Sequence, residues 1–491
     1  MTFVSVEYYL FLLGAVVLYY ILPVKIRWLA LLAENMTFYY IAAQHGRKMF
    51  LAIVLISYLG GLVLGKLNKN TPPPIIQSEG KSLKRLILFL ILILTSAPLL
   101  AIKEGNLIIQ RFLGKDGWSF FAPLGLSFFT VQMVGYLVDI YKGKIEPQKN
   151  PLKYMLFVSF FPQMIQGPIP RYQQLMPQLE TGHRFEPENI TAGFQMILWG
   201  FFLKFMIADK AAIVVNTVFA NSEVYRGMYV IVAGALYSLQ LYADFQACTK
   251  LAQGAARLFG IQIINNFNHP YFSKSIKEFW GRWHISLSEC LKDYVYIPLG
   301  GNRKGKLRKY LNLLITFLVS GVWHGSGYRF LVWGGLHAVY QISGDYTKPI
   351  REKAYELVGI EKNSTLQNFI KMFGTFCLAT IAWIIFRADS LRKGLSMIKS
   401  IFTVYNPWIL FNDSLFSLGL SWKEMMILLL SLMVLFCVSR KQEKGVGIRE
   451  MVQRQPLLIR WAIYIAVIVI IVVFGTYGFG FNAQDFIYEG F

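Results

Sequence analysis

Two of the six histidines in this sequence lie where an imidazole could perform acid–base chemistry. His324 ends the apolar run LLITFLVSGVWH, and His284 lies within FWGRWHISLSECL. Burial disfavours the charged form of imidazole and keeps it neutral near pH 7, which is the form that a general base requires. We therefore predict that one histidine takes a hydroxyl proton while the other holds an acyl carbonyl. The alternative is that both are structural core histidines.

Side chains beside these two histidines are the next candidates. An ionisable group at membrane depth is costly and by default marks a functional path, so its neighbours are expected to line that path. The predicted neighbours are Trp283, Ser286, Ser288, Trp323 and Gly325.

The other histidines receive structural interpretations. Three of them lie in polar loops or turns: His45, His183 and His269. His337 lies four residues after Trp333, on the same face of a predicted helix, where a hydrogen bond to a neighbouring helix is the favoured role. No third His, Cys or carboxylate has ligand spacing with the two candidate histidines, so no metal site and no bound cofactor are predicted.

Common catalytic signatures are absent from the sequence. It contains no G-x-x-x-x-G-K-[ST] phosphate loop, no H-E-x-x-H zinc motif and no G-x-S-x-G nucleophile elbow. The four cysteines are scattered in or beside apolar stretches without a C-x-x-C pair, which favours packing roles. Nucleotide hydrolysis, zinc proteolysis and standard esterase chemistry are therefore not predicted.

Composition places these residues in a membrane protein. Hydrophobic residues make up 55% of the 491 residues and charged residues only 15%, whereas about 25% of a soluble domain is charged. The chain has 49 Lys and Arg against 27 Asp and Glu, a net charge of +22. Basic residues collect in cytoplasmic loops of membrane proteins, so this excess is attributed to topology and not to nucleic-acid binding.

Apolar runs of about 20 residues predict an all-α, multi-pass architecture. The expected spans are roughly 5–22, 26–43, 49–65, 86–102, 117–141, 191–208, 227–247, 310–325, 328–345, 369–386, 423–439 and 459–480. Three further apolar stretches are too short or too interrupted by Pro and Gly to span: 151–169, 252–264 and 286–300. They are expected to be re-entrant or buried around an internal cavity, because irregular backbone at membrane depth needs protein or water around it.

Basic loops predict the orientation of the chain. Lys and Arg concentrate in 66–85, 303–309 and 440–460. Placing these loops in the cytoplasm puts the N-terminus outside, because three spans precede the first loop. The last span then leaves the C-terminal tail FNAQDFIYEGF outside as well.

Several longer motifs resemble a known family. FWGRWHISLSECLKDYVYIPLGGNRKG is followed by SGVWHG, and further supporting segments are FFPQMIQGPIPRY, LYADFQACTKLAQGAARLFG, NNFNHPYFSKSIKEFWGRWH and IIFRADSL. In this order they resemble the membrane-bound O-acyltransferase family. The resemblance is greatest to its bacterial branch that O-acetylates polysaccharides, typified by the alginate O-acetylation membrane protein.

The resemblance implies a fold and a pair of site residues. The expected fold is a single membrane domain over 1–491, with a signature core near 117–345, in which a ring of about 11–12 helices with re-entrant segments encloses a tunnel. The invariant histidine of the family matches His324, and its second histidine matches His284.

The resemblance also implies substrates and partners. An acyl group, expected to be acetyl, passes from a cytoplasmic thioester donor, acetyl-CoA or an acyl carrier, toward hydroxyls of an envelope polysaccharide outside the bacterial cytoplasmic membrane. An extracytoplasmic SGNH-type acetyltransferase is the expected partner, in addition to membrane lipid. A basic cytoplasmic surface would suit the anionic donor, and its candidate residues are Arg303, Lys304, Lys306, Arg308 and Lys309.

Three alternatives stay open at this point. Within the family, the related teichoic acid D-alanylation protein takes its acyl group from a carrier protein. A polysaccharide exporter without chemistry would need a wide polar path and an energy source, and no nucleotide motif is present. A scaffold that recruits extracytoplasmic enzymes would not need the two histidines at all.

Overall fold

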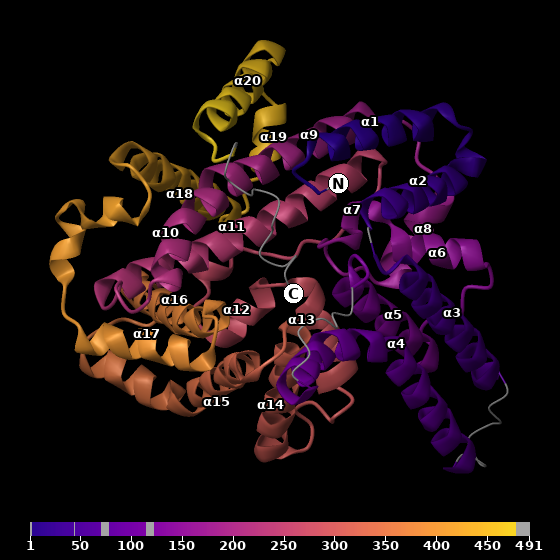
Figure 1. Ribbon diagram of the computed structural model, residues 1–491, viewed down its shortest axis with the longest axis horizontal. Helices are drawn as coiled ribbons and strands as arrows, with labels where there is room; N and C mark the ends of the chain where they lie inside the picture. Colours follow the sequence, from indigo (N-terminus) through magenta and orange to yellow (C-terminus); the bar gives the residue numbers. More distant parts are fainter. Residues whose placement is uncertain (1, 44, 70–77, 114–121, 478–491) are drawn as a thin grey trace. The chain divides into compact units, whose positions relative to one another are not determined.

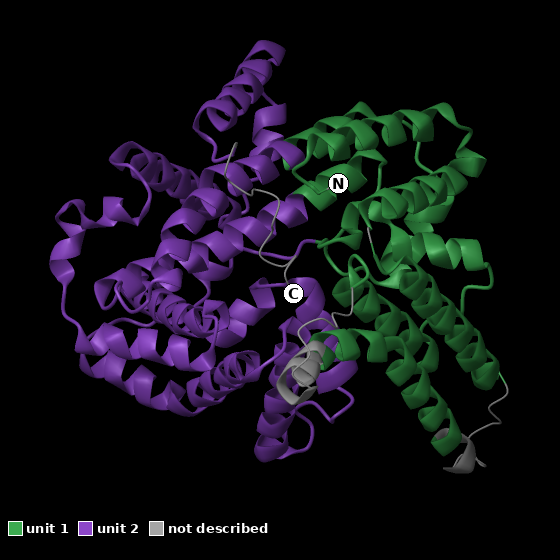
Figure 2. Cartoon of the chain, viewed as in Figure 1, with its two compact units in different colours: residues 1–196, 251–264, 491 green, residues 197–250, 265–490 purple. Residues whose placement is uncertain are grey.

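The computed structural model describes residues 2–43, 45–69, 78–113 and 122–477, and the regular elements within these residues are all helices (Figure 1). The prediction of an all-α membrane protein is confirmed. The described chain divides into two compact units (Figure 2). Unit one contains the residues up to 196 together with 251–264, and unit two contains 197–250 and the residues from 265 onward. The single domain expected over 1–491 stays a prediction.

Unit one is built from the first helices of the chain. They are α1 (Val6–Ile21), α2 (Arg27–Ala42), α3 (Arg47–Lys69), α4 (Ser78–Leu113), α5 (Leu126–Tyr141), α6 (Pro151–Ser159), α7 (Phe161–Met164), α8 (Tyr172–Thr181) and most of α9 (Pro187–Phe201), with a short 3₁₀ turn at Val24–Ile26.

Unit two holds both candidate histidines. Its helices are α10 (Asp209–Ala220), most of α11 (Met228–Leu258), α12 (Ile276–Arg282), α13 (Ile285–Leu291), α14 (Gly305–His324), α15 (Tyr328–Leu357), α16 (Thr365–Arg387), α17 (Leu391–Thr403), α18 (Trp422–Glu443), α19 (Ile448–Gln453) and α20 (Leu457–Phe474). Residues Phe202–Ala208 and Lys292–Tyr296 are π-helical. Short 3₁₀ turns lie at Pro270–Phe272, Pro407–Leu410 and Asp413–Leu418.

Within the described residues, six helices are long and apolar enough to cross a membrane. They coincide with six of the expected spans: Arg47–Lys69, Ser82–Lys103, Met228–Leu258, Thr365–Arg387, Trp422–Glu443 and Leu457–Phe474. The other expected spans lie on helices that are shorter or more polar. The ring of about 11–12 helices, the tunnel and the position of the N-terminus stay predictions. The C-terminal tail, part of the basic loop 66–85 and the first residues of the expected span 117–141 lie outside the described residues.

Two predicted boundaries are wrong. In the described part of the expected span 117–141, residues 122–125 are not helical and α5 begins at Leu126, after Gly125 with its left-handed φ of 74°. The stretch 252–264 is not a separate segment, because α11 continues through it to Leu258. The stretches 151–169 and 286–300 do break into short helices and turns, as the sequence predicts for segments that do not span.

Close packing of α14 against α15 sets the geometry of the candidate site. A Cβ added to Gly321 would collide with the backbone carbonyl of Phe330, and one added to Gly334 would collide with that of Phe317. The two glycines therefore allow the helix backbones to approach directly. This approach places Trp333 of α15 beside the last turn of α14.

Candidate active site

A buried turn between α12 and α13 holds His284. The residue has φ 45° and ψ 53°, a left-handed conformation that is uncommon outside glycine and that occurs often at functional sites. Asn266 fixes the turn: its backbone carbonyl accepts a hydrogen bond from the Ile285 N–H at 2.9 Å, and its Oδ1 accepts one from Ser286 Oγ at 2.6 Å. Ser286 therefore supports the turn, and its place on a substrate path stays a prediction.

Aromatic rings surround the imidazole of His284, which has no exposed surface. Phe245 of α11 and Trp323 of α14 pack against it edge-on, with ring centroids 4.7 and 5.9 Å away. Among the described residues neither ring nitrogen has a hydrogen-bond partner. Burial lowers the pKa of His284 well below its ordinary value, so the imidazole is neutral.

His324 is the last residue of α14 and is only 2% exposed. Its ring centroid lies 4.8 Å from Trp323, 4.9 Å from Trp333 and 5.6 Å from Phe386. The C-terminus of a helix carries a partial negative charge that favours a cation beside it. An imidazolium formed when His324 accepts a proton would therefore be stabilised by α14.

Trp323 connects the two predicted histidines, because its ring contacts both of them. The structure thus brings together His284 and His324, which come from separate elements of unit two. Trp283 is different: it is buried against Phe267, Phe279 and Trp383, on the packing side of its segment.

Gly325 has no spare donor for a substrate. Its backbone N–H already donates to the carbonyl of Gly321 at 3.3 Å, which closes the end of α14. The absence of a side chain at Gly325 leaves room for the ring of Phe330, which an added Cβ would strike. Its role in the structure is close packing.

His337, which the sequence assigns to a structural hydrogen bond, joins the same aromatic cluster. Its ring is fully buried and packs edge-on against Trp333 at 5.2 Å and Trp280 at 5.0 Å. Within the described part of the chain neither of its nitrogens has a hydrogen-bond partner, so the expected hydrogen bond is not formed there. Trp333 therefore contacts two histidines, His324 and His337.

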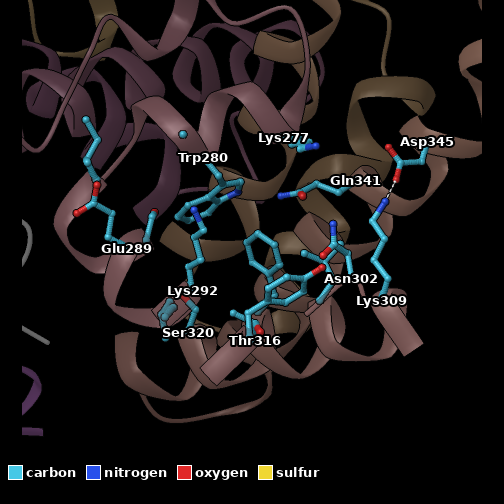
Figure 3. Close-up of a pocket in the computed structure, with 17 residues that line it drawn as sticks. Lys277, Trp280, Glu289, Lys292, Asn302, Lys309, Thr316, Ser320, Gln341 and Asp345 are labelled. Atoms are coloured by element: carbon cyan, nitrogen blue, oxygen red, sulfur yellow. Dashed lines mark hydrogen bonds and ion pairs between the residues drawn. The ribbon is translucent and has the colours of Figure 1, made fainter. Parts of the chain in front are cut away.

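A cavity of about 750 Å³ in unit two is lined by residues of α12, α13, α14 and α15, the helices that carry or flank these histidines (Figure 3). Its wall follows one face of α14, since the residues from this helix are spaced by three or four: Lys309, Leu313, Thr316, Phe317 and Ser320. One turn beyond Ser320 on the same face is His324. From Lys309 to Ser320 an α-helix rises about 16 Å, so the cavity follows α14 over that length toward His324.

The opposite walls come from α15 and from the α12–α13 segment. Asp345 and Gln341 are spaced by four on α15, and His337 continues that row one turn further. From α13 the cavity receives Ile285 and Ser288, next to His284. Ser288 therefore lines this cavity, and its Oγ donates to the carbonyl of Trp283 at 3.1 Å.

The basic residues predicted for donor binding separate into two groups. Lys309 lines the cavity and its Nζ pairs with Asp345 Oδ2 at 2.5 Å, the contact drawn in Figure 3. The others lie exposed in or beside the turn before α14: Arg303, Lys304, Lys306 and Arg308.

Sequence reasoning missed most of the lining. The missed side chains include Lys277, Trp280, Glu289, Lys292, Asn302 and Gln341. Helical spacing was the available signal, because 285, 288, 289 and 292 are spaced as one face across α13 and the π-helical turn after it. No described group of three His, Cys, Asp or Glu side chains is arranged to hold a metal ion.

A second missed feature is a buried ion cluster elsewhere in unit two. Lys204 Nζ lies 2.9 Å from Asp209 Oδ1 and 2.9 Å from Asp244 Oδ1, and the three side chains are at most 6% exposed. Asp244 precedes Phe245, which packs on His284. The π-helical turn at Phe202–Ala208 carries Lys204, and such turns occur often at functional sites.

Comparison with known proteins matches residues 143–384 to the model of the membrane-bound O-acyltransferase family. The probable alginate O-acetylase AlgI of Pseudomonas fluorescens is 32% identical over 407 residues, covering 83% of this chain and 76% of that protein. The peptidoglycan O-acetyltransferase of Helicobacter pylori is 35% identical over 305 residues, 57% of this chain and 56% of that protein.

The teichoic acid D-alanyltransferase of Bacillus subtilis is 28% identical over 265 residues, 52% of this chain and 66% of that protein. For the Helicobacter protein and for several other alginate O-acetylases, the match spans about half of the relative's length. The resemblance that the motifs predict is confirmed, and the family's model covers the segments that supply both histidines and the cavity. This chain belongs to the membrane-bound O-acyltransferase family.

Proposed function

We propose that this chain transfers an acyl group, acetyl in the first instance, from a thioester donor toward hydroxyls of an envelope polysaccharide. The observation that carries the proposal is the contact of His284 and His324 with one indole, Trp323, in the last turn of α14, whose preceding turns line a cavity of about 750 Å³. Two relatives support acetyl as the acyl group and a polysaccharide as the acceptor class, because one is named a probable alginate O-acetylase and the other a peptidoglycan O-acetyltransferase.

The chemistry assigns different work to the two imidazoles. A hydroxyl oxygen attacks the thioester carbonyl, the new C–O bond forms, and the C–S bond breaks. The hydroxyl proton goes to His324, where the end of α14 favours the cation, and then to the departing thiolate. His284 sits at the first turn of α13, where the neutral form is favoured, and it donates a hydrogen bond or orients the acyl group.

Negative charge that develops on the carbonyl oxygen needs preorganised donors. The N–H of Gly325 is engaged in closing α14, and Trp283 is packed away from the histidines. The donors that fit the arrangement are the imidazole of His284 and the indole N–H of Trp323. The proposal therefore gives Trp323 a direct part in the reaction.

The cavity suits an anionic thioester with amide groups, such as acetyl-CoA. Lysines 277, 292 and 309 line the cavity together with the carboxylates of Glu289 and Asp345, and Lys309 forms an ion pair with Asp345. Asn302 and Gln341 supply amide groups, while Trp280 and Phe317 supply aromatic walls. Its volume lies within the roughly 300–1,000 Å³ range of small-molecule sites.

Placement in the cell follows from the same proposal. Donor thioesters are made in the cytoplasm, so the cavity mouth near Lys309 would face that side, in agreement with the basic turn 303–309. The chain would then lie in the bacterial cytoplasmic membrane with its N-terminus outside. An extracytoplasmic SGNH-type acetyltransferase would accept the acetyl group and complete its delivery to the polymer.

Purified protein in lipid nanodiscs with radiolabelled acetyl-CoA tests the proposal. The wild type and a His45→Gln control, whose side chain lies exposed far along the sequence from the site, should release CoA in the presence of an acceptor hydroxyl. His324→Gln should lose that activity. Equal turnover by His324→Gln and the control would overturn the proposal, and so would a wild type that never consumes the thioester, as expected of an exporter or a scaffold.

The D-alanyl alternative is supported by the match to the teichoic acid D-alanyltransferase. It requires an acyl group on a carrier protein in place of a free coenzyme. Supplying the two donors side by side separates the functions: consumption of acetyl-CoA favours acetyl transfer, and consumption of a D-alanyl carrier alone favours the alternative.

A further inference from the structure

Helix α17 and the residues after it present an apolar surface that the function above does not use. Along α17, Leu391, Leu395, Ile398 and Phe402 are spaced by three or four and form one stripe. Leu395 is 51% exposed and Phe402 is 80% exposed. The stripe continues beyond the helix through large exposed aromatic side chains: Tyr405, Trp408 and Phe411.

The other faces of α17 have different partners. Gly394, Met397 and Ser400 are buried, and an added Cβ on Gly394 would touch Ile385 of α16, which runs beside α17 in Figure 1. Arg392, Ser396 and Lys399 lie exposed on a polar face. The helix is therefore three-sided, with one side packed on the protein, one apolar side uncovered and one basic side.

The ends of two candidate membrane spans lie beside this segment. α16 ends at Arg387, directly before α17. α11 begins at Met228, whose N–H donates to Asn406 Oδ1 at 2.8 Å. The neighbouring Gly227 N–H donates to Ser400 Oγ of α17 at 3.2 Å. The segment therefore lies at the level where α16 ends and α11 begins.

We propose that α17 and the loop through Phe411 lie in the interfacial layer of the bilayer, with the stripe against acyl chains and Arg392 and Lys399 at the headgroups. Amphipathic helices with basic polar faces bind in this way, and Trp and Tyr concentrate at the same depth. The apolar stripe continues the apolar surface of a neighbouring candidate membrane span, which supports lipid as the material that covers it. The stripe follows α16 directly in the chain, and large apolar residues of α16 are themselves exposed, among them Phe369, Phe373 and Leu378.

Spin labels measure the environment of each face directly. In a background with Cys377 and Cys437 replaced by serine, single cysteines at 395, 402 and 396 are labelled in nanodiscs. Positions 395 and 402 lie on the stripe, and 396 lies on the polar face of the same helix. The relaxation of each spin label is then measured with oxygen, which concentrates in lipid, and separately with a water-soluble nickel chelate.

The proposal expects the oxygen effect to dominate at 395 and 402, and the nickel effect to dominate at 396. Two stripe positions are used so that one poorly folded variant does not decide the result, and gel filtration checks each variant. Equal nickel accessibility at 395, 396 and 402 would overturn the proposal, because it would place the stripe in water, available to a partner protein. The measurement does not depend on acyl transfer.

Discussion

The indole of Trp323 meets the imidazole of His284 edge-on, with ring centroids 5.9 Å apart, while the same indole lies 4.8 Å from His324. Two histidines from separate elements therefore share one aromatic neighbour. Under the proposed function, the indole N–H of Trp323 is a candidate donor to the carbonyl oxygen of the thioester. The first prediction tests that role.

Replacing Trp323 should reduce turnover more than donor binding. Trp323→Phe keeps a ring but removes the N–H donor, and loss of one donor to a developing oxyanion lowers kcat by about 10²–10³-fold. KM for acetyl-CoA should change little. Phe386→Leu is the comparison, since Phe386 packs on His324 with ring centroids 5.6 Å apart but carries no N–H donor. Similar kcat values for the two variants would show that Trp323 contributes only packing.

The two histidines should behave as one unit. His284→Gln and His324→Gln are each expected to lower kcat/KM strongly, and the double variant should be little worse than the poorer single one. When two residues act in the same step, removing either one already removes most of their joint contribution, so the losses in transition-state stabilisation do not add. Steady-state kinetics of the wild type, the two single variants and the double variant form a double-mutant cycle that measures this. Additive losses would mean that the histidines act in separate steps.

Lysines in the cavity should bind the donor, and exposed lysines should not. Lys277→Gln and Lys292→Gln each remove a cation that lines the cavity. A hydrogen bond to a charged group is worth about 1.5–3 kcal/mol, so KM should rise about tenfold or more with kcat preserved. Lys304→Gln is the control, since Lys304 lies exposed outside the lining residues. A larger effect at Lys304 would restore the donor site predicted from the sequence.

Adjacent glycines of α15 should differ in tolerance to a methyl group. Gly334→Ala would strike the Phe317 carbonyl and separate α14 from α15, whereas Gly335→Ala meets open space. Overpacking costs about 1–3 kcal/mol of stability and shifts backbone, so Gly334→Ala should lose activity as the end of α14 moves. Gly335→Ala should retain it. The assay is turnover together with melting temperature, and equal tolerance would contradict the packing described here.

The buried cluster of Lys204 should matter for stability. Lys204→Met leaves Asp209 and Asp244 buried without their cation, and breaking a buried pair costs about 3–5 kcal/mol. Lys393→Met is the matched control, because Lys393 pairs with the 69% exposed Asp389 side chain, and such surface pairs contribute about 0–1 kcal/mol. Thermal unfolding in detergent compares the two. A Lys204→Met protein as stable as the control would show that the cluster is not held by its charges.

Local patterns predicted most of the helices, because apolar runs are visible in the sequence. The WHIS and WHG motifs pointed to two histidines, and the structure places both against Trp323. The cavity was harder to predict. Which residues of α12, α13 and α15 face Lys309 and Ser320 depends on how separate helices pair, and that pairing is set by contacts such as Gly321 on Phe330. The donor side was therefore assigned to the exposed turn.

The Lys204 cluster had no signal in the local pattern. Lys204 sits inside an apolar run, and its partner Asp244 lies forty residues further along the chain in another helix. The role of His337 was missed for a related reason: a histidine on an apolar helix face has the same pattern whether it makes a hydrogen bond or packs among rings.

The most direct test of the central claim is a cryo-electron microscopy structure of the protein in nanodiscs with a thioether analogue of acetyl-CoA. The account predicts density along the face of α14 from Lys309 to Ser320, with the atoms that replace the acetyl thioester reaching His284, Trp323 and His324. Analogue bound elsewhere, or a cavity that stays empty while both imidazoles remain sealed among aromatic rings, would contradict it.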